Sequence, residues 1–237
     1  MKGCELQMWT KICGVTRLED AVAIARAGAS AIGLNFYPGS RRYVSVPKAR
    51  PIAEAVRALS GRALPLDLVG VFVNMPTDEL TETVFEVGLT AVQFHGDESV
   101  DAIGAFHHQM PQIRIIRALR VSGERLEEQF HSLDELQQVV PLAACLLDAF
   151  ASGEYGGTGM TVDPSISQRY LETERPKLIL AGGLTPENVG PVSQTSAAWG
   201  VDTASGVESA PGIKDVEKCL AFIRSAAQNS CSAETRL

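Results

Sequence analysis

Short apolar runs alternate with amphipathic segments along most of the chain. The runs have the length of β-strands, and they occupy residues 8–13, 31–37, 68–73, 91–95, 113–119, 144–148, 178–181 and 200–203. Most are nearly continuous in apolar residues, as is typical of strands that are covered on both faces. The pattern therefore predicts a parallel sheet that is buried on both faces.

The segments between these runs carry apolar residues at helical spacing, most clearly over residues 18–28. Gly28 is a C-terminal stop signal, and Thr16 followed by Glu19 has the spacing of a capping box. Thr77 and Thr185 stand at two further predicted helix starts. The remaining helices are predicted at residues 47–59, 77–87, 99–108, 125–139, 164–170, 186–194 and 215–227.

Eight strand–helix units in 237 residues favour a closed α/β barrel. A (β/α)8 TIM barrel typically has ~250 residues. No GxGxxG motif opens the first helix, as it would in a doubly wound dinucleotide-binding sheet. Because no stretch has the composition of a linker, residues 1–237 are expected to form a single barrel domain, with a frayed polar tail at residues 228–237.

Charge and cysteine content exclude several classes of function. The formal net charge is −7, so we expect neither nucleic acid nor membrane as a partner. The five cysteines form no CxxC pair, which argues against a disulfide framework and a thiolate zinc site. Reduced thiols fit a cytoplasmic protein. No histidine has a cysteine or histidine at ligand spacing, so we expect no metal and no cofactor.

Reactive or polar side chains stand at the predicted carboxyl ends of the strands, where TIM barrels place their active sites. They are Cys13, Arg41, Arg42, Asn74, His95, Arg117, Asp148 and Asp202. Several also have a purely structural interpretation. Cys13 could be a small apolar filler, Asp148 a helix cap and Asn74 a turn residue. The two adjacent arginines could be solvated, and a hydrogen-bonded imidazole without a catalytic role is the favoured interpretation of His95.

Three glycine-rich stretches follow the last three strands. Gly182-Gly183 follows the seventh strand and Ser205-Gly206 the eighth, which are the two loops that build phosphate sites in such barrels. Gly156-Gly157 follows the sixth strand, in a loop able to close over a ligand. These stretches favour a phosphorylated ligand.

Eight segments, taken together, resemble phosphoribosylanthranilate isomerase, the Amadori-rearranging enzyme family of tryptophan biosynthesis. The segments are KICGVTRLEDA, GLNFYPGSRRYV, GVFVN, AVQFHGDE, LLDAF, EYGGTG, LAGGLTPENV and SGVESAPGIKD. They occur in the family's order and span roughly residues 10–218, which is nearly the whole chain.

The resemblance implies a role for particular residues of this chain. It makes Cys13 the general base and Asp148 the general acid, and it gives Arg42 the anthranilate carboxylate. It identifies Asp202 as the family's strand-eight aspartate. It assigns the phosphate to the loops after strands six to eight, which hold Gly156, Gly157, Gly182, Gly183, Ser205 and Gly206.

Two departures from the family's pattern lie in these loops. Met160 stands where the family often has a lysine, which removes one positive charge near the phosphate. Ala204 stands where the family often has a serine, so one hydroxyl is displaced in the loop after strand eight. Neither departure touches the implied acid–base pair.

The implied substrate is a phosphorylated aminosugar, N-(5′-phosphoribosyl)anthranilate. An apolar strand end would favour the neutral form of Asp148 that ring opening needs. Cys13 would act as thiolate, and since a free thiol titrates near ~8.5, only modest tuning would be required. Lys11, two residues before Cys13 on the same strand, could contribute to that tuning.

This assignment makes a geometric prediction. Cys13 and Asp148 should flank one cavity within about 6–10 Å of each other, the width of a sugar. The glycine loops should converge at one end of that cavity, and Arg42 should stand at the opposite end. A monomer is favoured over a homodimer. The alternatives are another sugar-phosphate isomerase or epimerase barrel, or a barrel that binds phosphorylated ligands without catalysis.

Overall fold

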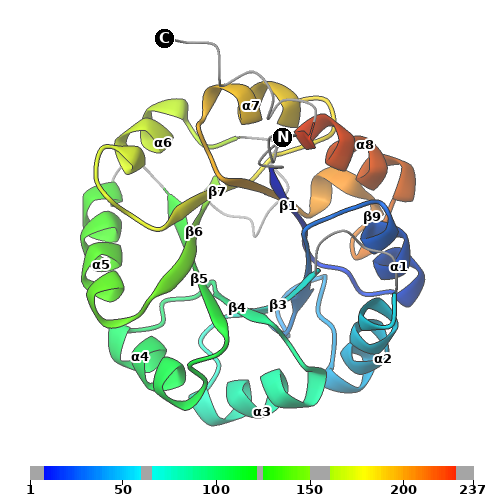
Figure 1. Cartoon of the computed structure of the whole chain (residues 1–237), viewed down its shortest axis with the longest axis horizontal. Helices are drawn as coiled ribbons and strands as arrows, with labels where there is room; N and C mark the ends of the chain where they lie inside the picture. The colour runs from blue at the N-terminus through cyan, green and yellow to red at the C-terminus, as the bar shows by residue number, and fades with distance from the viewer. Residues whose placement is uncertain (1–7, 60–65, 122–124, 150–160, 228–237) are drawn as a thin grey trace, which may run out of the picture.

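The computed structural model describes residues 8–59, 66–121, 125–149 and 161–227. Eight parallel strands pair in chain order and close into a barrel, because β1 pairs with both β2 and β8. Figure 1 looks along the barrel and shows the helices as a ring outside the strands. The prediction of a TIM barrel is therefore confirmed.

The strands follow the predicted apolar runs closely. They are β1 Trp9–Ile12, β2 Ala31–Asn35, β3 Asp67–Phe72, β4 Ala91–Phe94, β5 Arg114–Val121, β6 Leu142–Ala149, β7 Lys177–Ala181 and β8 Gly200–Thr203. One predicted end is wrong. β5 continues to Val121, so Arg117 lies inside the strand rather than at its carboxyl end.

The helices also match the predicted segments, with one shifted start. They are α1 Leu18–Arg26, α2 Val46–Arg57, α3 Thr77–Val87, α4 Val100–Gln109, α5 Leu126–Val139, α6 Pro164–Leu171, α7 Val189–Thr195 and α8 Val216–Ala227. α7 begins three residues later than predicted because the Asn188 side chain closes the preceding turn. Its amide accepts from the Thr185 N–H and donates to the Gly183 carbonyl.

The prediction of a capping box before α1 is wrong. The residue at the N-cap is Arg17, which makes no side-chain capping bond, and the Thr16 hydroxyl instead donates to the Gly212 carbonyl at 2.6 Å. Gly212 lies in a hairpin that the sequence analysis missed, formed by β9 Glu208–Ala210 and β10 Ile213–Lys214 after the short 3-10 helix Ser205–Val207. Gly28 follows the end of α1 with φ +93°, as its role as a stop requires.

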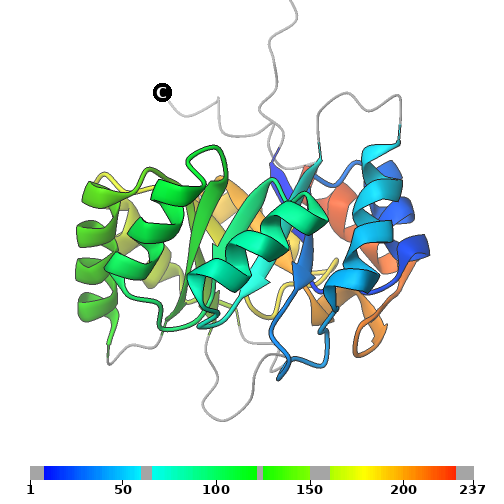
Figure 2. The same ribbon diagram turned by 90° about the horizontal axis from the view of Figure 1, so that it is seen from below.

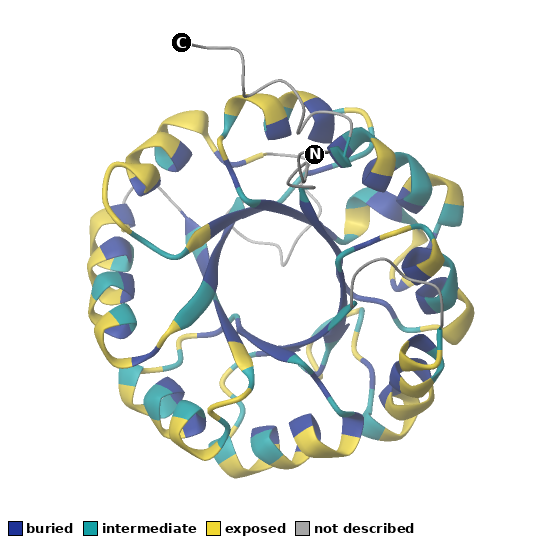
Figure 3. Cartoon of the chain, in the orientation of Figure 1, coloured by how far each residue is buried: buried dark blue, intermediate teal, exposed yellow. Residues whose placement is uncertain are grey.

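Two apolar layers hold the barrel together. The outer layer joins the strands to the inward faces of the helices, so each helix in Figure 3 is buried on one side and exposed on the other. The inner layer fills the barrel and consists mainly of small or β-branched side chains around Trp9, which stacks on Trp199. Small residues suit the limited space inside an eight-stranded barrel.

The alternation of side chains along each strand determines which groups face the barrel axis. On β1, Trp9 belongs to the inner layer and Ile12 to the outer one, so Lys11 and Cys13 are the next inward positions. Figure 2 shows the barrel from the side, with the loop after β2 and the β9–β10 hairpin projecting at the same edge. The carboxyl ends of all eight strands meet at this edge because the strands are parallel.

The outer layer provides a matched test of the packing. Phe106 on α4 is fully buried and meets Phe94 edge to face, whereas Phe85 on α3 is 82% exposed. Phe106→Ala should lower the free energy of unfolding by ~3–5 kcal/mol, because it removes a buried ring and leaves a cavity. Phe85→Ala should change it by less than about 0.5 kcal/mol. Urea titrations of both variants measure these differences, and similar values for the two would contradict the assigned packing.

Candidate active site

A buried ion pair lies directly beneath Cys13 inside the barrel. Lys11 Nζ is 3.1 Å from Asp202 Oδ1, and the Lys11 side chain has no exposed surface. Lys11 and Asp202 are register partners on β1 and β8, the strands that close the barrel. Both atoms are close but poorly aligned, so neither has a hydrogen-bond partner of good geometry among the described residues. The ammonium therefore keeps donor capacity on the side of Cys13.

The pKa values of this cluster reflect competition between burial and charge. Burial raises the pKa of the Cys13 thiol, and the Lys11 ammonium opposes that rise. Burial by itself lowers the pKa of Lys11, but the Asp202 carboxylate and Cys13 more than offset it, so the net direction is upward. The sequence-based view that the thiol needs only modest tuning is thus incomplete. The thiolate depends on Lys11, which remains an ammonium.

Gly33 on β2 makes room for this cluster. A Cβ atom at position 33 would lie 2.7 Å from Cys13 Sγ, closer than real contacts allow, and 3.0 Å from Lys11 Cε, which is unusually tight. Only glycine lets the two reactive side chains fit between β1 and β2. The sequence showed this glycine in an apolar run, but its purpose depends on the neighbouring strand.

Asp148 lies near the end of β6 and faces an imidazole. His95 Nε2 is 3.5 Å from Asp148 Oδ2, and His95 Nδ1 is 2.7 Å from Gln93 Nε2. With the Gln93 amide donating to Nδ1, the ring proton lies on Nε2 and points at Asp148. The sequence analysis favoured a purely structural role for His95, and it missed this arrangement because Gln93, His95 and Asp148 come from strands β4 and β6.

The apolar setting expected for Asp148 is not found. Its side chain is 30% exposed, and the group beside it is a half-buried imidazole rather than apolar surface. The N-cap interpretation is not found either, since Asp148 lies inside β6. Asp148 and Cys13 nevertheless lie at the same end of the barrel. Both act electrostatically on the buried Asp202 cluster, where burial raises the pKa of Asp202 and the Asp148 charge adds to that rise.

Arg42 forms a bidentate ion pair with Glu208 at the barrel rim. Its Nε and Nη2 atoms donate to the two carboxylate oxygens, each at 2.8 Å. Glu208 also accepts from Lys214 Nζ at 3.0 Å. Burial alone would raise the pKa of Glu208, but Arg42 and Lys214 hold it below its usual value. Arg42 therefore enters an internal network instead of standing free.

Arg42 is tied to the chain that follows the strand-eight loop, because its partner Glu208 begins β9 directly after the 3-10 helix Ser205–Val207. The β9–β10 hairpin folds back and carries Glu208 toward the loop after β2. This hairpin was not predicted, because its two strands are only three and two residues long and leave no pattern to recognise. The separation of Arg42 from the glycine loops stays a prediction.

The loops after β7 and β8 converge, as expected. The Thr203 hydroxyl donates to the Leu184 carbonyl at 2.7 Å, and any side chain at Gly206 would collide with that same carbonyl. Gly182 and Gly183 have positive φ values of +83° and +58°, which suit glycine. Gly156, Gly157 and Met160 lie outside the described residues.

Asn74 has a structural role, in agreement with its interpretation as a turn residue. It adopts φ +51°, and its amide oxygen accepts from the Asp97 N–H. Its own N–H donates to Glu98, which also receives Arg117 at 2.7 Å. These bonds fix the loops after β3 and β4 and give Arg117 a partner outside the barrel's centre.

These features define a (β/α)8-barrel enzyme with ionisable groups gathered at the carboxyl ends of its strands. The family profile described as N-(5′phosphoribosyl)anthranilate (PRA) isomerase matches residues 10–225. The chain is 45% identical over 216 residues to the N-(5′-phosphoribosyl)anthranilate isomerase of Myxococcus xanthus, covering 91% of this chain and 94% of that protein. It is 42% identical over 215 residues to the enzyme of the same name from Pseudomonas savastanoi pv. phaseolicola, covering 90% and 95%.

Solved structures agree with this result. The phosphoribosyl anthranilate isomerase of Thermotoga maritima superposes with a TM-score of 0.78 at 35% identity, covering 92% of this chain and 98% of that one. A structure of phosphoribosyl anthranilate isomerase with reduced 1-(o-carboxyphenylamino)-1-deoxyribulose 5-phosphate gives a TM-score of 0.74, with the same identity and coverage.

The chain belongs to the N-(5′-phosphoribosyl)anthranilate isomerase family. It is an isomerase of tryptophan biosynthesis, and its substrate is a small phosphorylated molecule. Among the described residues, no helix is both long and apolar enough to cross a membrane.

The Lys11–Cys13 contact gives a test by pH. Lys11→Met, combined with Asp202→Asn to avoid an unpaired buried carboxylate, should raise the pKa of the Cys13 thiol by at least about one unit, because a neighbouring positive charge is lost. The rate of Cys13 alkylation by iodoacetamide, followed by peptide mass spectrometry, should then rise at correspondingly higher pH. Cys145 and Cys219 are internal controls, since burial raises the pKa of each to about 12. An unchanged profile would show that Lys11 does not support the thiolate.

Proposed function

We propose that Cys13 is the general base and Asp148 the general acid of this isomerase. The observation that carries the proposal is a buried thiol next to a buried ammonium, at the barrel end that also holds the Asp148 carboxyl group. A non-catalytic ligand-binding barrel would have no need for a buried ammonium beside a thiol. Burial of such charges is costly and needs a reason.

The first step opens the sugar ring. Protonated Asp148 donates its proton to the furanose ring oxygen, and the bond from C1′ to that oxygen breaks. The lone pair of the anthranilate nitrogen forms the C1′=N iminium bond. His95 supports this step by directing its Nε2 proton at the Asp148 carboxylate that results. Asp148 remains partly exposed, so water can return its proton after turnover.

The second step removes a proton from carbon. The iminium makes the C2′–H acidic, and the Cys13 thiolate takes that proton. The bond electrons form a C1′=C2′ double bond, and the iminium electrons return to nitrogen. The enolamine then gains a proton at C1′ and loses one from the C2′ hydroxyl, which gives the 1-(2-carboxyphenylamino)-1-deoxyribulose phosphate. A positioned acid or base contributes ~10²–10⁴-fold in such steps.

Lys11 and Asp202 prepare the thiolate. Lys11 is a positioning residue here, because its ammonium acts through Cys13 and Asp202 holds it in place. Its unsatisfied donor capacity is what a thiolate would use. Family resemblance alone would make Asp202 a substrate-binding residue. We assign it this supporting role instead, because it pairs with Lys11.

Arg42 is proposed to bind the anthranilate carboxylate. A planar guanidinium binds carboxylates with two parallel bonds, and Arg42 already does so with Glu208. Glu208 keeps Lys214 as a second partner, so it remains neutralised when Arg42 shares or exchanges it for the substrate. This exchange is a cost in binding that a free arginine would not carry.

The phosphate is proposed to bind at the loops after β7 and β8. The Leu184 carbonyl lies against both Thr203 and Gly206, so the two loops are in contact. This contact supports convergence of the backbone N–H groups of Gly182, Gly183, Ser205 and Gly206 on one anion. Gly156 and Gly157 are proposed to close over it by family resemblance.

We also propose that residues 1–237 form one domain that acts as a monomer in the cytoplasm. Cys13, Cys145 and Cys219 are unpaired, which supports a reducing compartment. Light scattering of the purified protein tests the monomer.

The acid–base assignment is tested with purified protein and freshly made phosphoribosylanthranilate, by loss of its anthranilate fluorescence. Cys13→Ala should lose ~10²–10⁴-fold in kcat, and Asp148→Asn should do the same while still binding the reduced product analogue. Cys145→Ala removes a buried thiol outside the site and is the matched control. If Cys13→Ala kept more than about a tenth of wild-type kcat, the base would have to be another group.

The carboxylate assignment rests on two adjacent arginines. Arg42→Met should raise KM at least about tenfold with a smaller effect on kcat, because a bidentate ion pair to the substrate is lost. Arg41→Met should leave both constants close to wild type, since Arg41 lies outside the described network. Steady-state kinetics of the pair decides. The reverse pattern would transfer the carboxylate to Arg41.

A further inference from the structure

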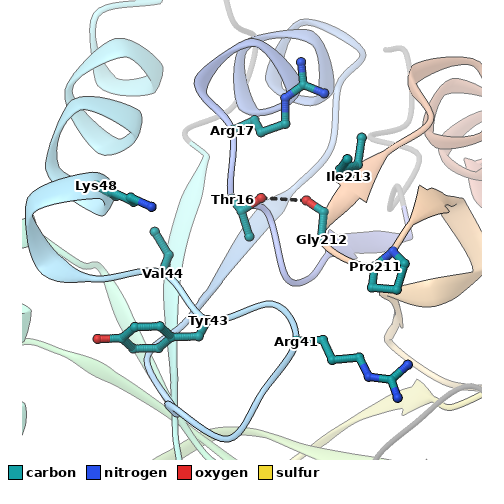
Figure 4. A pocket seen from close by; sticks show the side chains of 9 residues that line it. All are labelled: Thr16, Arg17, Arg41, Tyr43, Val44, Lys48, Pro211, Gly212 and Ile213. Carbon is teal, nitrogen blue, oxygen red and sulfur yellow. Dashed lines mark hydrogen bonds between the residues drawn. The ribbon is translucent and has the colours of Figure 1, made fainter.

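A pocket of about 380 Å³ lies on the outer side of the barrel rim. It is formed by the loop after β1, the loop after β2 with the first turn of α2, and the β9–β10 hairpin (Figure 4). Its lining residues are Thr16, Arg17, Arg41, Tyr43, Val44, Lys48, Pro211, Gly212 and Ile213. None of them belongs to the proposed acid–base site or binds the substrate carboxylate. Arg42 pairs with Glu208, while its neighbours Arg41 and Tyr43 line this pocket.

The pocket is positively charged in a protein of net charge −7. It has three basic residues and no acidic one. Arg17 pairs with Glu19, whereas the side chains of Arg41 and Lys48 have no ion-pair or hydrogen-bond partner within the described part of the chain. Lys48 lies in the first turn of α2, and Ser45 at the N-cap makes no side-chain capping bond. A positive charge at a helix N-terminus is electrostatically unfavourable, and a bound anion would relieve it.

The pocket has apolar side chains beside its basic ones, and its frame is held in place. Tyr43 is 44% exposed and Ile213 39% exposed, which is unusual for side chains of their size. Such surfaces favour contact with a flat apolar ring. The Thr16–Gly212 bond closes the floor, and the Gly212 N–H donates to Glu208. A framework fixed before binding lowers the cost of binding.

We propose that this pocket binds a small aromatic carboxylate. Lys48 extends toward Thr16 in the middle of the pocket, and Tyr43 lies below it (Figure 4). The carboxylate would accept from Lys48, and the ring would pack against Tyr43 and Ile213. Arg17 and Arg41 extend from the rim, and the exposed, unpaired Arg41 can turn over the ligand. The inference concerns binding alone and does not depend on the proposed catalytic roles.

Benzoate is the probe, titrated by ligand-observed NMR while reduced 1-(o-carboxyphenylamino)-1-deoxyribulose 5-phosphate fills the active site. Benzoate should still bind. Arg41→Met/Lys48→Met should weaken it at least about tenfold, because charge-assisted hydrogen bonds are lost. Tyr43→Ala should weaken benzoate but not inorganic phosphate. Arg50→Met removes an exposed charge from the same helix outside the pocket and should change nothing.

Any of four results would overturn the proposal. Benzoate binding that disappears when the product analogue is present would belong to the active site. Binding that survives Arg41→Met/Lys48→Met, or no binding at all, would show that the pocket is a surface feature without a ligand. Equal affinity for phosphate and benzoate, both unaffected by Tyr43→Ala, would show that charge alone is recognised.

Discussion

The ion pair between Lys11 and Asp202 connects the closure of the barrel to its chemistry. Two charges buried without water are stable only when they meet, and these two meet because β1 and β8 are neighbours in register. Any slip between the first and last strands would separate an ammonium from its carboxylate inside an apolar barrel. The same pair supplies the positive charge next to Cys13, so the requirement that fixes the fold also prepares the thiol.

A second charged network lies at the rim, and its role differs from that of the interior cluster. Arg42, Glu208 and Lys214 join the loop after β2 to the β9–β10 hairpin, while Lys11, Asp202 and Cys13 occupy the interior. The interior cluster is suited to proton transfer because charges there are poorly screened. In the rim network the side chains of Glu208 and Lys214 are buried, and the partly exposed Arg42 is the member suited to recognising anions. Cys13 and Lys214 still influence each other's pKa, so the two networks are not independent.

The elements set by local sequence patterns could be predicted, whereas contacts between distant parts of the chain could not. The eight strands were predictable because each is a short apolar run, and the helices because their apolar faces repeat locally. The capping box at Thr16 failed because its hydroxyl found a carbonyl on Gly212, almost at the other end of the chain. The contact of His95 with Asp148 and the pairing of Arg42 with Glu208 were missed for the same reason. Each joins side chains from separate loops or strands.

The sequence by itself determined the barrel, the order of its elements, and the presence of Cys13 and Asp148 at strand ends that must share one edge. Parallel strands place their carboxyl ends together, so this much needs no coordinates. Only the tertiary structure decided the environment of those groups: that Lys11 lies beside the thiol, that Asp148 faces His95 and water, and that Arg42 is already paired. The energy of a charge depends on what surrounds it in space, and those neighbours are remote in the chain.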